Sequence, residues 1–230
     1  MDIVSIHRYP FTSSLAASEA SREQLYQSVV VWETIIPALR SKILEHTGKE
    51  LPVAVTEVNS HWTNVSGQEA SPDSFANAVW WADVLSRMIM QDVEVVTYFS
   101  LQSNANIGSY GLFERYGIRP TYYVYLVFKG MGQTRVYASS SDADVTLLAT
   151  RCADNDIAVL FVNRAMEDKQ LPLEVKGSEA LANLRVVLLT EEIQAEEVSA
   201  EDLIAGQPSG YRQNLYCKLL IVKTTSFVEI

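Results

Sequence analysis

Residues 51–60 read LPVAVTEVNS, a stretch in which a proline is followed by an apolar run and then by polar residues. The run Val53-Ala54-Val55 is apolar throughout and does not alternate with polar residues. A continuous apolar run is typical of a strand buried on both faces in a parallel sheet. The polar residues that follow begin with Thr56 and Glu57. We therefore predict a buried strand over 52–57 with a glutamate at its carboxyl end.

Strands and helices alternate on either side of this strand. We predict a short strand over 3–7 before it and a third strand over 93–99 after it. Two amphipathic helices connect the strands, with apolar residues at spacings of three and four. These residues are Leu25, Val29, Trp32, Ile36, Leu39 and Ile43 in the first helix, and Phe75, Ala78, Ala82, Leu85 and Ile89 in the second. The order βαβαβ predicts a parallel sheet with right-handed crossovers.

The ends of the two helices also leave signals in the sequence. Ser21 and Gln24 have the spacing of a capping box at the start of the first helix. Pro37 predicts a kink within that helix, and Gly48 predicts its end. Ser71-Pro72 predicts an N-cap followed by proline in the first helical position of the second helix.

From about residue 121 onward, short strands replace the helical periodicity. We predict strands over 122–128, 135–138, 145–149, 157–163, 171–175, 185–189 and 215–222, and an exposed loop or single helical turn over the acidic stretch 191–202. Regularly spaced short strands are typical of an antiparallel β-sandwich. The predicted fold class is therefore α/β followed by all-β, with domains 1–117 and 118–230 that meet in a segment rich in glycine, serine and asparagine.

The composition excludes several classes of function. The 230 residues include 18 basic and 28 acidic side chains, so the net charge of −10 argues against nucleic-acid binding and against a polybasic membrane anchor. No apolar run approaches the roughly 18 residues of a membrane span, and the first residues do not resemble a signal peptide, so we expect a cytoplasmic protein. Cys152 and Cys217 have no cysteine or histidine at zinc-binding spacing, and nucleotide-binding glycine motifs are absent. We expect no metal and no organic cofactor.

Polar and aromatic residues cluster where the three predicted parallel strands end. Ligands bind at the carboxyl edge of parallel α/β sheets, so these side chains form the candidate site. They are His7 and Tyr9 after the first strand, Glu57 and Asn59 after the second, Trp62 in the following loop, and Tyr98 and Phe99 after the third.

The residues alone leave the roles of Glu57 and His7 open. A glutamate at the end of a buried strand has the environment that a nucleophilic or acid/base carboxylate requires. The alternative is a carboxylate that pairs with an arginine or caps a loop. For His7 the residues alone favour a structural role over a catalytic one, and the pair Trp80-Trp81 is interpreted as part of the core.

The strand at residues 51–60 resembles the seventh barrel strand of clan A glycoside hydrolases, in particular family 51 α-L-arabinofuranosidases and family 39 β-xylosidases. Residues 5–10 (Ser-Ile-His-Arg-Tyr-Pro) resemble the sixth strand and residues 93–102 the eighth. Residues 110–113 and 119–123 resemble the passage from the barrel into a C-terminal β-sandwich. The resemblance implies a partial TIM-type barrel of three β/α units. It also implies that Glu57 is the nucleophile, with the other candidate residues arranged around the sugar.

Two departures from this pattern bear on the activity. The eighth strand of the clan often supplies a tryptophan, where this chain has Tyr98 and Phe99. Counterparts of strands one to five are absent, and with them the Asn-Glu pair that carries the acid/base. A retaining glycosidase needs two carboxyl groups about 5 Å apart. The second carboxyl group would have to come from a loop residue such as Glu69 or Asp73, or from a neighbouring subunit.

Two functions therefore stay open at the level of sequence. The first is a retaining glycoside hydrolase that acts on an oligosaccharide or aryl glycoside through Glu57. The second is a non-catalytic carbohydrate-binding remnant, or the C-terminal part of a split glycosidase. An unrelated α/β binding module would require the resemblance to be coincidental. Because three β/α units cannot close a barrel, we expect a homodimer or a higher homo-oligomer.

Overall fold

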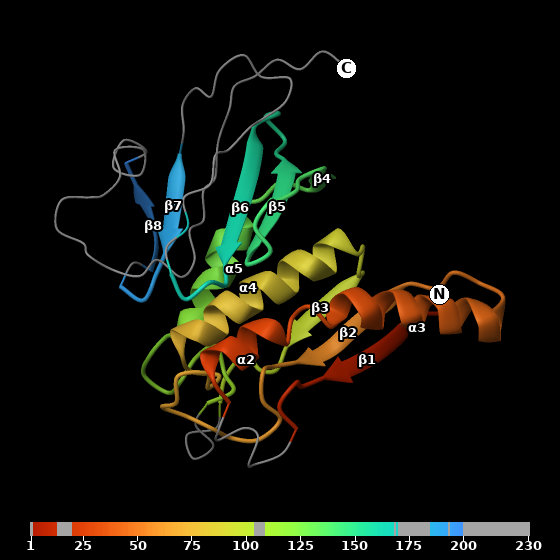
Figure 1. The fold of residues 1–230 in the computed structure, drawn as a ribbon, viewed down its shortest axis with the longest axis horizontal. Coiled ribbons are helices and arrows are strands. Elements are labelled where there is room, and N and C mark those ends of the chain that lie inside the picture. Colours follow the sequence, from red (N-terminus) through yellow and green to blue (C-terminus); the bar gives the residue numbers. More distant parts are fainter. Residues whose placement is uncertain are drawn as a thin grey trace. The chain divides into compact units, whose positions relative to one another are not determined.

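The computed structural model describes residues 2–12, 20–103, 109–167, 169, 185–192 and 194–199 (Figure 1). The chain divides into two compact units, Met1–Tyr122 and Tyr123–Ile230. The strands predicted over 171–175 and 215–222, and Cys217, lie outside the described residues.

The first unit contains a three-stranded parallel sheet in the order β1-β2-β3. Its strands are β1 (Val4–Arg8), β2 (Val53–Val58) and β3 (Val95–Tyr98), which lie side by side in Figure 1. The prediction of three parallel strands is therefore confirmed. Within the described residues the strands do not close into a barrel, and β1 and β3 form the edges of this sheet.

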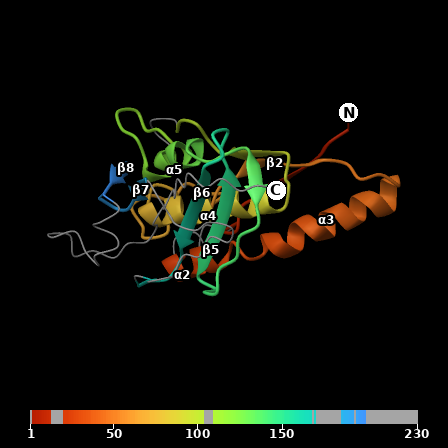
Figure 2. The same cartoon turned by 90° about the horizontal axis from the view of Figure 1, so that it is seen from above.

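Two helices, rather than one long one, connect β1 to β2. They are α2 (Arg22–Gln27) and α3 (Trp32–Thr47), and Figures 1 and 2 show the break between them. The Ser28 hydroxyl donates to the carbonyl of Leu25 at 2.7 Å and caps the end of α2, and the branched run 29–31 follows in a turn. The predicted apolar face is confirmed, with Leu25, Val29, Trp32, Ile36 and Ile43 buried.

The predicted helix ends are confirmed for the first of these connections only. Ser21 and Gln24 form the capping box of α2, and Gly48 ends α3 in the left-handed conformation with φ of 67°. Pro37 lies within α3, as predicted. The N-cap predicted at Ser71 is wrong, because Ser74 caps the next helix by accepting from the amide of Asn77 at 3.1 Å.

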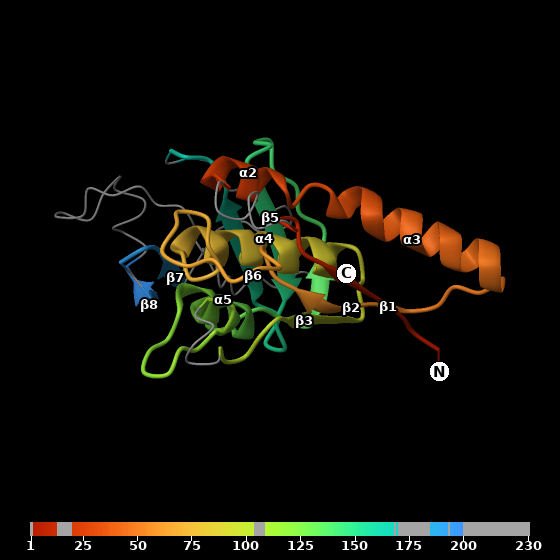
Figure 3. The ribbon, with the colours of Figure 1, turned by 90° about the horizontal axis from the view of Figure 1, so that it is seen from below.

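Helix α4 (Phe75–Met90) connects β2 to β3 and is buried on nearly all sides. Figure 3 shows α3 and α4 on the same side of the parallel sheet. The adjacent residues Trp80 and Trp81 are 1% and 0% exposed, which confirms that they belong to the core. The opposite face of the sheet exposes the polar side chains Ser5, His7, Thr56 and Thr97, with the apolar Ile3 and Val95 exposed at its edge strands.

The second unit contains two antiparallel sheets. One has β4 (Thr134–Val136), β5 (Val145–Arg151) and β6 (Ile157–Asn163) in that order, and the other pairs β7 (Val186–Leu189) with β8 (Gln194–Val198). Four of the predicted strands, over 135–138, 145–149, 157–163 and 185–189, correspond to β4 to β7.

Two predictions for this half of the chain are wrong. Residues 122–128 belong to helix α5 (Pro120–Lys129), which runs across the division between the units, and not to a strand. Pro120 stands in the first position of α5, where the fixed φ of proline favours a helix. The acidic stretch from residue 191 contains β8, in which Glu197 is the register partner of Val187. The carboxylate of Glu197 also forms an ion pair with Arg185, with Nε and Oε2 2.8 Å apart.

No helix in the described part of the chain combines the length and apolar character needed to cross a membrane.

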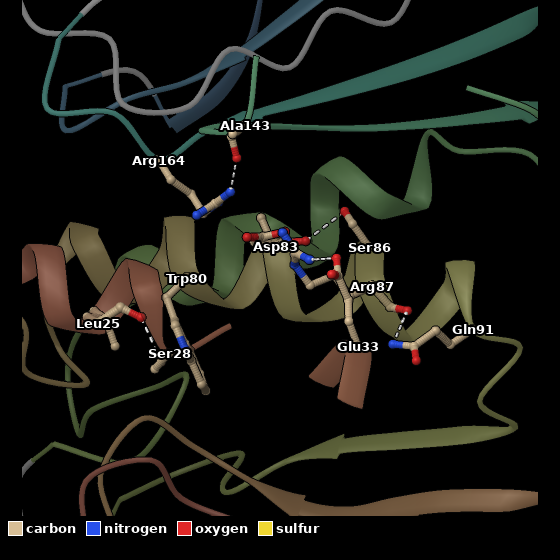
Figure 4. A network of polar contacts seen from close by, with 11 residues as sticks. Leu25, Ser28, Glu33, Trp80, Asp83, Ser86, Arg87, Gln91, Ala143 and Arg164 are labelled. Carbon is tan, nitrogen blue, oxygen red and sulfur yellow. Dashed lines mark hydrogen bonds and ion pairs between the residues drawn. The ribbon is translucent and has the colours of Figure 1, made fainter. Parts of the chain in front are cut away.

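A buried ion cluster joins α3 to α4 (Figure 4). Arg87 donates through Nε to Asp83 Oδ1 at 3.0 Å, and its Nη1 forms an ion pair with Glu33. The side chains of Arg87 and Asp83 are 7% and 0% exposed, whereas that of Glu33 is 63% exposed. Because Asp83 is buried with Arg87, it has the larger part in compensating the charge of the guanidinium.

We predict that Asp83→Ala lowers the free energy of unfolding by about 3 kcal/mol, because it leaves a buried guanidinium without its buried carboxylate. Glu33→Ala is the matched control, and its effect should stay below about 1 kcal/mol since water replaces an exposed carboxylate. Urea unfolding followed by tryptophan fluorescence measures both variants. All four tryptophans lie in the first unit, so the signal reports on it alone. Equal effects of the two substitutions would contradict this account.

Candidate active site at the carboxyl edge of the parallel sheet

Glu57 lies near the end of β2 and is held by a residue that follows β1. The Tyr9 hydroxyl donates to Glu57 Oε2 at 2.9 Å. The parallel pairing brings the two together, since His7 is the register partner of Glu57 and Tyr9 lies two residues further on. Tyr9, one of the residues that the sequence groups with Glu57 at this edge, is therefore its hydrogen-bond partner. The side chain of Glu57 is 38% exposed, so a bound molecule can reach the carboxylate.

His7 contacts the same carboxylate oxygen. Its Nδ1 lies 3.5 Å from Glu57 Oε2, and its Nε2 lies 3.1 Å from Thr56 Oγ1. Neighbouring residues of a regular strand point to opposite faces, but β-bulges change the direction of side chains. The register of β1 with β2 shifts between Ile6 and His7, which allows one ring to contact both Thr56 and Glu57.

The partners of Glu57 among the described residues are therefore a tyrosine and a histidine, and not an arginine. The pKa of Tyr9 is raised well above its ordinary value, first by burial and then by the hydrogen bond to Glu57 and the charge of that carboxylate. Tyr9 therefore stays protonated at neutral pH and remains a donor.

Aromatic rings stand beside this carboxylate. Phe99 packs edge-on against Tyr9 with ring centroids 6.4 Å apart, and against Tyr110 at 5.9 Å. Phe99 is 41% exposed. Burial raises the pKa of Tyr110. The sequence did not predict Tyr110 as a site residue, because it follows no strand and enters the site through its contact with Phe99.

Two predicted site residues lie below the surface. Asn59 is fully buried, and its Nδ2 donates to the carbonyl of Phe99 at 2.5 Å and to that of Tyr110 at 3.4 Å. Tyr98 is also buried and accepts from Asn77 Nδ2 at 2.9 Å, and burial raises its pKa to about 12. The structure therefore places both side chains beneath the surface, where Asn59 holds the backbone of Phe99 and Tyr110. Contact of Asn59 or Tyr98 with a ligand stays a prediction.

Trp62 lies beyond the end of β2 with its side chain in solvent. It is 61% exposed, and its amide donates to the carbonyl of Phe11 at 3.1 Å. This contact, with the bridge between Phe11 and His61, continues the pairing of the first two strands past their ends. Contact between Trp62 and a ligand stays a prediction.

The two carboxylates considered as acid/base lie in the loop before α4, and each has partners of its own. Glu69 Oε1 accepts from the amide of Arg22 at 3.0 Å. Asp73 accepts from the amide of Gly67 at 3.1 Å and from the Ser71 hydroxyl. Neither contacts Glu57. Among the described residues, no three histidine, cysteine, aspartate or glutamate side chains are grouped so that they could hold a metal ion.

Solved structures with a similar fold include glycoside hydrolases. The chain is similar to a family 44 xyloglucanase from Paenibacillus polymyxa, with 16% identity and a TM-score of 0.63 over 98% of this chain and 47% of the other. It is similar to a family 51 arabinofuranosidase from Xanthomonas axonopodis pv. citri, with 13% identity and a TM-score of 0.57 over 97% and 51%. A family 39 β-xylosidase from Caulobacter crescentus matches with 19% identity and a TM-score of 0.51 over 81% and 37%. The chain has a glycosidase-like fold.

This glycosidase-like fold is established by structure and not by sequence. No family model matches the chain, and no curated protein matches it in sequence. The chain spans between 37% and 51% of the three solved structures named above.

We predict that Glu57→Gln lowers the pKa of Tyr9 toward the ordinary value of 10.0, because the substitution removes the negative charge next to the hydroxyl. The pKa should remain above that value, since burial of Tyr9 is unchanged. Titration of tyrosine Cζ resonances in ¹³C-labelled protein measures the shift, with Tyr9→Phe used for assignment. Glu50→Gln, an exposed carboxylate just before β2, is the matched control and should leave the Tyr9 pKa unchanged. An unchanged pKa in Glu57→Gln would show that the two groups do not interact.

Proposed function

We propose that this protein is a retaining glycoside hydrolase in which Glu57 is the nucleophile. The observation that carries the proposal is the position of Glu57 within a glycosidase-like fold. Its carboxylate is half-exposed at the carboxyl edge of a parallel sheet and accepts a hydrogen bond from Tyr9. That edge is where parallel α/β folds bind their ligands.

In this reaction a Glu57 oxygen attacks the anomeric carbon, and the bond from that carbon to the leaving oxygen breaks. The leaving oxygen takes a proton from the acid/base, and a glycosyl ester forms on Glu57. Water, deprotonated by the same acid/base, then attacks the anomeric carbon and releases Glu57 as a carboxylate. Tyr9 and His7 contact Glu57 Oε2 and hold the carboxylate in place for the attack. The exposed rings of Phe99 and Trp62 are suited to stacking on sugar faces.

The proposed architecture is a partial TIM-type barrel over residues 1–117 followed by an antiparallel β-sandwich over 118–230. The three parallel strands with α3 and α4 on one side support the first part. The two antiparallel sheets β4-β5-β6 and β7-β8 support the second.

We propose further that the chain forms a homodimer or higher homo-oligomer that completes the site. Parallel sheets are normally covered on both faces, yet one face of this sheet carries exposed side chains, and its edge strands β1 and β3 each leave one side unpaired within the described residues. Exposed apolar side chains accompany these edges, with Ile3 and Val95 each 40% exposed. Because Glu69 is bound to the amide of Arg22 and Asp73 to its own loop, a second copy is the better source of the acid/base carboxylate.

A second candidate function is a non-catalytic carbohydrate-binding remnant, or the C-terminal part of a split glycosidase. The observation that favours it is the absence of a second carboxylate among the partners of Glu57 in the described residues. The chain also spans less than two thirds of the glycoside hydrolases it resembles.

We predict that the protein hydrolyses at least one member of a panel of aryl glycosides. Aryl xylosides and arabinofuranosides come first, since the similar structures are named as β-xylosidase and arabinofuranosidase. Glu57→Gln should reduce kcat/KM by a factor on the order of 10³ or more, because it removes the nucleophile. Glu50→Gln removes a carboxylate outside the site and should leave the rate unchanged. No turnover by the unsubstituted protein on any substrate would favour the second candidate function.

We expect size-exclusion chromatography with light scattering to show a dimer or larger assembly that dissociates on dilution. Val95→Lys places a charge on an edge strand and should shift the equilibrium toward the monomer. Leu44→Lys is the matched control, because Leu44 is 49% exposed on α3 and away from the sheet. A folded monomer at all concentrations, or equal effects of the two substitutions, would contradict the proposed assembly.

A further inference from the structure

Both ring nitrogens of His7 face a polar partner. Nδ1 lies 3.5 Å from Glu57 Oε2, and Nε2 lies 3.1 Å from Thr56 Oγ1. A neutral imidazole carries a proton on one nitrogen only, and the partner of the other nitrogen decides which one. The tautomer of His7 therefore follows from the chemistry of these two partners.

The carboxylate of Glu57 determines whether Nδ1 of His7 carries the proton. An ionised glutamate only accepts hydrogen bonds, so attraction to Glu57 requires a proton on Nδ1 of His7. Nε2 of the neutral ring must then accept. The Thr56 hydroxyl can supply that proton, because a hydroxyl both donates and accepts.

The surroundings of Thr56 leave its hydroxyl able to donate to His7. The Ser5 hydroxyl is hydrogen-bonded to Thr56 Oγ1 and can act as the donor in that contact. Thr97 Oγ1 donates to the carbonyl of Thr56 at 2.5 Å, and so fixes the backbone without using the Thr56 hydroxyl. One consistent direction of donation then runs from Ser5 to Thr56, from Thr56 to His7 and from His7 to Glu57.

We propose that Thr56 is a positioning residue: by donating to Nε2 it acts with the Glu57 carboxylate to hold the neutral ring of His7 in the Nδ1–H tautomer, so that His7 donates to Glu57. Its significance for catalysis rests on the proposed function. Tyr9 and His7 then both donate to Oε2, and Oε1, to which no described residue donates, is the oxygen that attacks the sugar.

The test reads the tautomer directly and needs no substrate. The full chain is labelled with ¹⁵N-histidine, and long-range ¹H–¹⁵N spectra are recorded at a pH above the titration of the ring, as determined in the same spectra. The chain has three histidines, and His7→Gln assigns the signals of His7. We expect a protonated Nδ1 and an unprotonated Nε2 in the unsubstituted protein.

Three variants separate the hydroxyl of Thr56 from its shape. Thr56→Val keeps the branched side chain but lacks the hydroxyl, so the proton of His7 should move toward Nε2. Thr56→Ser retains the hydroxyl and should restore the original tautomer. Thr97→Val removes the neighbouring hydroxyl that binds the backbone, and it should leave the tautomer unchanged. The signals of His61, which is fully buried, report in each case whether the first unit is folded.

An Nε2–H tautomer in the unsubstituted protein would overturn the proposal, whether or not any variant folds. An unchanged tautomer in folded Thr56→Val would do so as well. If the protein is active, Thr56→Val should lower kcat by about tenfold with little change in KM, because a hydrogen bond to a charged group is worth roughly that factor. An inactive protein with the Nδ1–H tautomer would refute the proposed function and leave this assignment standing.

Discussion

The parallel pairing of β1 with β2 is the interaction on which the candidate site depends. It places the residues that follow β1 beside the end of β2, where Tyr9 and His7 reach Glu57. The shift in register between Ile6 and His7 is part of this arrangement, because a regular ladder would send neighbouring side chains to opposite faces. The site therefore depends on the pairing of two strands that are far apart in the sequence. Phe99, which follows β3, packs against Tyr9 at one side of it.

The sequence predicted this grouping because strand ends can be located from apolar runs and parallel order. The parallel order predicted that His7, Tyr9 and Glu57 would meet, but it could not distinguish a side chain at the surface from one beneath it. Asn59 and Phe99 both follow their strands closely, yet Asn59 is buried against the backbone of Phe99. Tyr110 lies in a loop and reaches the site through its contact with Phe99. The path of a loop depends on tertiary contacts, which the spacing of apolar residues does not predict.

The fold was predicted best where a regular pattern of apolar residues extended over a long segment. The faces of α3 and α4 and the antiparallel strands β5 and β6 are of this kind. Residues 122–128 consist of aromatic and branched side chains, which have strand propensity. They nevertheless form part of helix α5, which begins at Pro120, because strand propensity depends strongly on the structural surroundings. In β8 the acidic side chains indicated solvent exposure correctly, but an exposed edge strand and an exposed loop have the same composition.

The polar face of the parallel sheet has a consequence for how the chain behaves in solution. An open sheet with an apolar face favours aggregation, since identical chains bury such surfaces against one another without specificity. Here the exposed positions carry Ser5, His7, Thr56 and Thr97, which water can solvate. The net charge of −10 adds mutual repulsion between chains. The hydroxyls on this face therefore disfavour non-specific association, and the exposed apolar side chains Ile3 and Val95 confine apolar contact between chains to the strand edges.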